Sequence, residues 1–103
     1  MNVQVGQALD VTLNNWDAMS GSEGDEAEEA ANAFEASFYI FIDTLSDWVL
    51  ELEQPPQTLE EFLELPMIQS IVERLPAPLY LNFETEAELI IENKTRIEED
   101  KYD

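Results

Sequence analysis

Residues 35–56, EASFYIFIDTLSDWVLELEQPP, combine the most apolar stretch of the chain with charges of one sign only. Ten large apolar side chains lie between Phe38 and Leu52. All the charged residues of the stretch are acidic, and they are Glu35, Asp43, Asp47, Glu51 and Glu53. A helix with this composition is expected to bury its apolar side and to carry its carboxylates on the other side.

Apolar side chains recur at helical spacing over residues 27–52, which predicts a long helix that ends near Glu53. Further aromatic and aliphatic residues widen the apolar arc, so we expect burial on much of the circumference. Pro55 and Pro56 end the helix, because proline has no backbone N–H to donate. This helix is therefore predicted to form the spine of the domain.

Shorter helices are predicted on both sides of the long helix. A first helix of about fifteen residues follows from apolar residues at helical spacing between Val5 and Trp16, although Val3 and Val5 also fit the start of a short strand. Pro66 suits the first position of a helix over residues 66–75. Capping-box sequences that predict helix starts are SEGD at residues 22–25, TLEE at 58–61 and TEAE at 85–88.

Residues 78–83 carry Leu79, Leu81 and Phe83 in alternation, which predicts a short extended segment before the last helix. The last helix, from residue 85 onward, is expected to bury Leu89, Ile90 and Ile97. A chain of 103 residues is long enough for one domain with a core and too short for two. We therefore predict a mainly α fold: one domain over residues 1–103, a small helical bundle around the long central helix, with at most one minor strand or hairpin.

Charge limits the class of partner. The chain has 24 acidic residues and 4 basic ones, for a formal net charge of −20. Direct binding to nucleic acid or to an anionic membrane surface is excluded, because phosphate contacts require Lys or Arg. Residues 1–13 lack the features of a signal peptide, and no apolar run approaches the ~20 residues that span a bilayer. We expect a cytoplasmic protein, a monomer or weak dimer, whose partner is a basic protein.

No residue pattern supports catalysis or a cofactor. The chain has neither histidine nor cysteine, which removes the usual general base, the thiolate nucleophile and the nitrogen and sulfur ligands of most metal sites. Carboxylate pairs are too numerous for any one pair to indicate acid–base catalysis. We therefore predict no enzymatic activity, no catalytic residue, no cofactor and no metal. A weak calcium site at residues 25–29 stays open, although a helix start also favours carboxylates there.

The density of negative charge is close to that of nucleic acid. A domain of about 100 residues has a diameter of roughly 33 Å, and this length of duplex DNA carries on the order of 20 charges. Residues 1–73 contain 16 acidic side chains and no basic one. In size and charge the chain resembles the small acidic nucleic-acid mimics that phages and bacteria direct against DNA-binding enzymes, without sharing a motif. The resemblance implies an inhibitor or regulator of a DNA- or RNA-binding protein.

Asp43, Asp47 and Glu51 lie four residues apart, so on a helix they climb about 6 Å per step as a ladder of carboxylates. The predicted partner-binding residues are Glu35, Asp43, Asp47, Glu51, Glu53, Glu60, Glu61 and Glu64. An alternative function is an accessory subunit or adaptor that docks through apolar surface, with the charge serving solubility. A halophilic origin would also explain the acidic composition.

The excess of negative charge predicts that salt stabilises the protein at pH 7. Raising NaCl from about 0.01 M to about 0.15 M shortens the screening length from about 30 Å to about 8 Å, which weakens repulsion among the carboxylates. We expect the free energy of unfolding to rise by about 1 kcal/mol, or roughly 4–8 °C in melting temperature. Thermal unfolding followed by circular dichroism measures this shift. A melting temperature that is unchanged or lower at the higher salt concentration would contradict the expectation.

Overall fold

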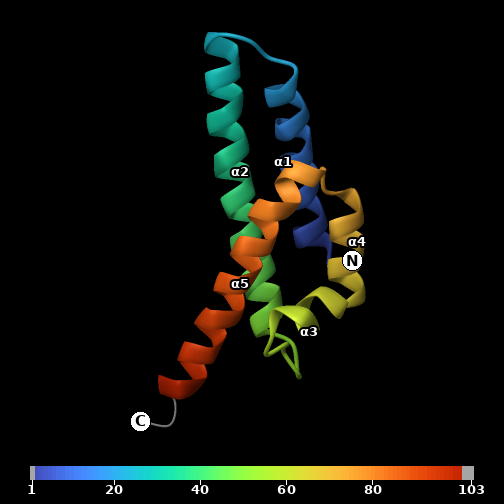
Figure 1. Cartoon of the computed structure of the whole chain (residues 1–103), viewed down its shortest axis with the longest axis vertical. Coiled ribbons are helices and arrows are strands. Elements are labelled where there is room, and N and C mark those ends of the chain that lie inside the picture. The colour runs from blue at the N-terminus through green and yellow to red at the C-terminus, as the bar shows by residue number, and fades with distance from the viewer. Residues whose placement is uncertain (1, 101–103) are drawn as a thin grey trace. The chain divides into compact units, whose positions relative to one another are not determined.

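The computed structural model describes residues 2–100, with side chains as far as residue 92, and this part of the chain contains helices but no strand. The predicted mainly α fold is confirmed. The helices (Figure 1) are α1 (Val3–Ser20), α2 (Asp25–Leu50), α3 (Leu59–Glu64), α4 (Pro66–Arg74) and α5 (Ala77–Asp100). Contacts divide the chain into two compact units, Met1–Trp48 and Val49–Asp103. The expectation of a single domain stays a prediction.

The first unit consists of α1 and most of α2, two neighbouring helices that run in opposite directions (Figure 1). α1 begins at a side-chain cap, because the Asn2 Oδ1 atom accepts hydrogen bonds from the backbone N–H of Gln4 at 2.9 Å and of Val5 at 3.2 Å. The cap satisfies two N–H groups that have no partner within the helix. Val3 and Val5 therefore lie in the first turn of a helix, and the strand interpretation is wrong.

α2 begins after Gly24 without a side-chain cap from Ser22. Gly24 has a φ of 66°, in the left-handed region that glycine enters without steric cost, and its carbonyl accepts the N–H of Ala27 at 3.1 Å. The capping box predicted at residues 22–25 is wrong, because the Ser22 hydroxyl donates to the Ala18 carbonyl at 2.6 Å. Ser22 thereby satisfies one of the C-terminal carbonyls of α1 that lack a partner within the helix.

α2 confirms the predicted long helix and ends at Leu50, slightly before the predicted end at Glu53. Three acidic residues lie in its first turn, where the helix dipole favours negative charge. Its buried side chains are Ser37, Phe38, Phe41, Ile42, Leu45 and Val49. Tyr39, Ile40 and Leu50 are exposed, so burial covers less of the circumference than the apolar arc of the sequence predicted.

The second unit contains α3, α4 and α5, and α3 contacts both of the other helices. α3 starts at the predicted capping box: the Thr58 hydroxyl accepts the N–H of Glu61 at 3.1 Å, and the Glu61 carboxylate accepts the N–H of Gln57 at 2.8 Å. Pro66 occupies the first turn of α4, as predicted. The rings of Phe62 and Phe83 are both fully buried and lie 6.2 Å apart. The other fully buried large side chains here include Ile68, Ile71 and Leu79.

Residues 78–83 form the first turns of α5, so the predicted minor strand is wrong. Leu79 and Phe83 are fully buried at a helical spacing of four, whereas Leu81 between them is 67% exposed. Alternation over so short a stretch fits both a strand and a helix, and burial of every fourth residue selects the helix. Proline at position 78 is tolerated because the N–H groups of a first helical turn lack partners within the helix.

Thr85 lies inside α5, so the capping box predicted at residues 85–88 is also wrong. Its hydroxyl donates to the Leu81 carbonyl at 3.1 Å, one turn back along the same helix. Ile90 is buried as expected, but Leu89 is exposed. The side chain of Ile97 lies outside the described residues.

The two threonines give a matched test of these helix starts. Thr58→Ala should lower the free energy of unfolding by about 1 kcal/mol, because it removes a cap. Thr85→Ala should leave it unchanged or raise it by up to ~0.5 kcal/mol, because alanine favours the interior of a helix more than threonine does. Urea unfolding of both variants measures the difference. A destabilisation by Thr85→Ala as large as that by Thr58→Ala would mean that a helix starts at residue 85.

Candidate functional site

A belt of polar side chains fixes α1 against α2 in the first unit. We define this polar belt as Thr12, Asn15 and Ser37. The Thr12 hydroxyl is fully buried and lies 2.8 Å from the Ala8 carbonyl oxygen and 3.1 Å from the Ser37 carbonyl oxygen. The Asn15 side-chain amide donates to the Ser37 hydroxyl at 3.0 Å, and this hydroxyl donates to the Phe34 carbonyl at 2.9 Å. Hydrogen bonds that cross between the helices set their axial register.

Aromatic rings pack beside the polar belt. The Trp16 ring of α1 meets the Phe34 ring of α2 edge to face, with centroids 5.3 Å apart. Phe34 also stacks on Phe38 at 5.8 Å, one turn further along α2. Such pairs are each worth about 0.5–1.5 kcal/mol beyond the burial of their area. The rings therefore hold the helix pair together on one side of the belt.

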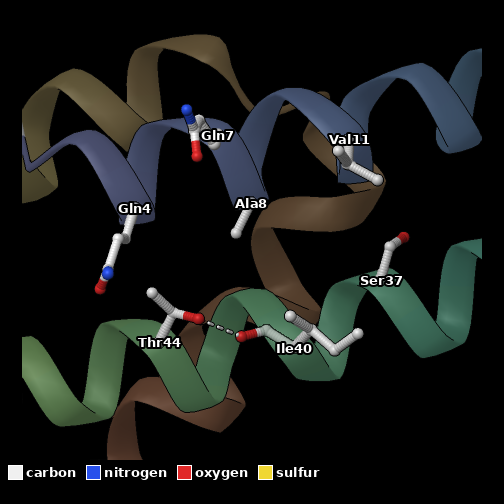
Figure 2. Close-up of a pocket in the computed structure, with 7 residues that line it drawn as sticks. All are labelled: Gln4, Gln7, Ala8, Val11, Ser37, Ile40 and Thr44. Atoms are coloured by element: carbon white, nitrogen blue, oxygen red, sulfur yellow. Dashed lines mark hydrogen bonds between the residues drawn. The ribbon is translucent and has the colours of Figure 1, made fainter.

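A groove of about 450 Å³ lies between the two helices on the other side of the belt. This α1–α2 groove is lined by Gln4, Gln7, Ala8, Val11, Ser37, Ile40 and Thr44 (Figure 2). None of these residues is charged. The small Ala8 side chain faces α2 in Figure 2, and the Thr44 hydroxyl turns back to donate to the Ile40 carbonyl at 2.7 Å. The groove therefore presents apolar carbon and two glutamine amides.

The acidic residues of α2 all lie on one half of the helix. At about 100° per residue, they occupy one half of the circumference, and the buried residues occupy the other. This acidic face of α2 comprises Asp25, Glu26, Glu28, Glu29, Glu35, Asp43 and Asp47. Ile40 shares the face, because Asp43 and Asp47 follow it at i+3 and i+7. Carboxylates thus flank the groove along α2.

The structure places the eight predicted partner-binding residues on the surface, in three groups. Glu35, Asp43 and Asp47 belong to the acidic face of α2. Glu51 and Glu53 follow the end of α2, so the regular ladder of carboxylates stops at Asp47. Glu60, Glu61 and Glu64 lie on α3 in the second unit, where Glu61 also takes part in the cap. Whether they serve one partner stays a prediction.

The groove is the feature that the sequence did not predict. Val11 lies outside the apolar pattern of the first helix, and Ile40 belonged to an arc that was expected to be buried. Instead, Val11 is 52% exposed and Ile40 is 61% exposed. An apolar residue on the charged side of a predicted amphipathic helix is the signal that could have indicated this surface.

Nothing in the described residues indicates a metal site or a membrane span. No group of three Asp or Glu residues is placed to hold a metal ion within this part of the chain, so the calcium site at residues 25–29 gains no support. None of the helices, within the same residues, is both long and apolar enough to cross a bilayer. No protein-family model, curated protein or solved structure matches the chain.

A double-mutant cycle tests the polar belt. Asn15→Ala and Ser37→Ala each remove one partner of a hydrogen bond between the helices and should each lower the free energy of unfolding by about 0.5–1.5 kcal/mol. The double variant should lose less than the sum, with a coupling energy of about 0.5 kcal/mol or more. Urea unfolding measures all three. Asn14→Ala, at an exposed neighbouring position, is the matched control and should show no coupling to Ser37→Ala. If Asn14→Ala coupled to Ser37→Ala as strongly as Asn15→Ala does, the hydrogen bond assigned to the polar belt would be contradicted.

Proposed function

We propose that this protein is not an enzyme and that it binds a basic surface of another protein, where it imitates the charge of a nucleic acid. It acts as an inhibitor or regulator of a DNA- or RNA-binding protein. The observation that carries this proposal is the exposure of its carboxylates. In residues 2–92, none of the 20 acidic side chains is buried, and Arg74 is the only basic side chain.

The acidic face of α2 supplies the strongest support. It places seven carboxylates on one side of a helix over about 33 Å, from Asp25 to Asp47. One strand of DNA carries about ten phosphates over the same length. The long helix holds the carboxylates in fixed order, and the first unit as a whole carries ten acidic residues and no basic one. Such a surface attracts a basic protein from a distance and accelerates the encounter.

A second function is favoured by a separate observation. Large apolar side chains are exposed on both units, among them Val3, Tyr39, Leu81 and Leu89. An accessory subunit or adaptor would bury such residues against its partner, and its charge would then serve solubility. The two functions differ in what binding should depend on: charge and salt for the mimic, apolar contact for the adaptor.

The partner can be isolated by its competition with DNA. Immobilised protein is exposed to a nuclease-treated lysate of its source cells, and bound proteins are released with duplex DNA. We expect the released protein to bind nucleic acid, whereas the acidic protein itself should not bind it. Failure of DNA to release any bound protein would contradict the mimic function.

Neutralising the acidic face of α2 should slow the encounter with that partner. The triple variant Glu35→Gln, Asp43→Asn, Asp47→Asn should retain its fold, because all three side chains are exposed. At low salt its association rate should fall by roughly 3- to 10-fold, and the dependence of the rate on ionic strength should flatten. Stopped-flow measurements over a range of NaCl concentrations provide both quantities.

A matched control separates the acidic face from net charge alone. Glu84→Gln, Glu88→Gln and Glu92→Gln make the same change of net charge on a different helix, α5. We expect the association rate of this control to change by less than about twofold. Equal slowing in both variants would mean that net charge alone drives binding. No slowing in either would favour the adaptor.

A further inference from the structure

The α1–α2 groove is an uncharged opening in a strongly negative unit. It has a volume of about 450 Å³, and its apolar walls come from Ala8, Val11 and Ile40. Val11 and Ile40 keep more than half of their surface in water. Apolar surface exposed at this level is stabilised when another apolar side chain covers it.

Carboxylates of α2 stand beside the groove. Asp43 and Asp47 share the outward face of Ile40, which lines the groove, and both are exposed. The first unit contains no basic residue beside these two carboxylates. An apolar centre inside a charged rim is the usual arrangement of a protein-binding surface.

We infer that the α1–α2 groove receives an apolar side chain from a basic segment of the partner, in which Lys or Arg residues flank that side chain. The inference rests on the proposed function and specifies the chemistry of the partner. Charge complementarity selects this occupant, because the carboxylates of the rim attract the flanking cations. It disfavours a second copy of the chain, whose first unit would bring ten further acidic residues and no basic one.

Each part of the surface has its own role in recognition. The carboxylates accelerate the encounter and orient the basic segment. The groove then holds the complex together, since burial of an apolar anchor slows dissociation. Gln4 and Gln7 can donate to and accept from the polar groups beside that anchor. A nucleic acid offers its phosphates without a groove for this anchor, so the groove lets the protein select among basic surfaces.

Two synthetic peptides test the inference. Each is a helix of about 15 residues with the same number of lysines. One carries leucine along the opposite face, and the other carries glutamine there. We expect the native protein to bind the leucine peptide about tenfold more tightly, which is the effect of one good apolar anchor. Titration calorimetry gives both dissociation constants, and NMR shift changes should centre on Ala8, Val11 and Ile40.

Two variants close the groove in different ways. Ala8→Leu fills it and keeps it apolar, whereas Val11→Gln with Ile40→Gln makes its walls polar at exposed positions that the fold does not require. Both should reduce the preference for the leucine peptide from about tenfold to within about twofold. Leu81→Gln, at an exposed apolar position of α5, is the matched control and should retain the full preference. Melting temperatures verify that each variant is folded. If Ala8→Leu does not fold, the variant with Val11→Gln and Ile40→Gln alone tests the inference.

The outcomes separate the groove from the proposed function. Equal affinity for both peptides, unaffected by the groove variants, would overturn the inference and leave charge-driven binding intact. Failure of both peptides to bind even at about 0.02 M salt would overturn the inference and the proposed function together. If a leucine peptide with glutamates in place of its lysines bound as tightly as the leucine peptide with lysines, that result would overturn the choice of a basic segment as the occupant. A native dimer in sedimentation that Val11→Gln with Ile40→Gln dissociates would assign the groove to a second copy.

Discussion

The hydrogen bonds of the polar belt constrain everything proposed for the first unit. The buried Thr12 hydroxyl reaches a carbonyl of its own helix and the Ser37 carbonyl of the other, and Asn15 reaches the Ser37 hydroxyl. Apolar packing alone tolerates sliding, but buried polar groups lose stability when they lose their partners. A slide of one helical turn, about 5.4 Å, would break these bonds and would carry Ala8 away from Ile40. The groove exists only in the register that the belt selects.

α2 tolerates its excess of negative charge because burial outweighs repulsion. Phe38, Phe41 and Leu45 are buried, and each contributes about 1.5–3 kcal/mol relative to an exposed side chain. Like charges one turn apart, such as Asp43 and Asp47, cost only a few tenths of a kcal/mol in a helix. The apolar half of α2 thus stabilises a helix whose other half can be devoted to charge. A free-standing acidic helix would lack this compensation, so the charged surface depends on the fold.

Charge and apolar contact contribute to different properties of a complex. The carboxylates act over distance, raise the association rate and lose strength in salt. The groove acts only at contact and changes the lifetime of the complex. A surface that joins Ile40 to Asp43 and Asp47 combines both properties on one helix face. The proposed mimic and the alternative adaptor therefore differ in how much each contact contributes to binding.

The sequence by itself determined the charge, the absence of histidine and cysteine, the helical class and the burial of residues such as Phe41, because composition and periodicity are local properties. It also identified the Thr58 cap, whose partners lie within three residues. The tertiary structure decided the polar belt and the groove, since Thr12 and Ser37 are 25 residues apart and no local pattern pairs them. It likewise decided that Leu81 stays exposed inside a helix. A short alternation fits two kinds of backbone, and only contacts with residues distant in sequence select one of them.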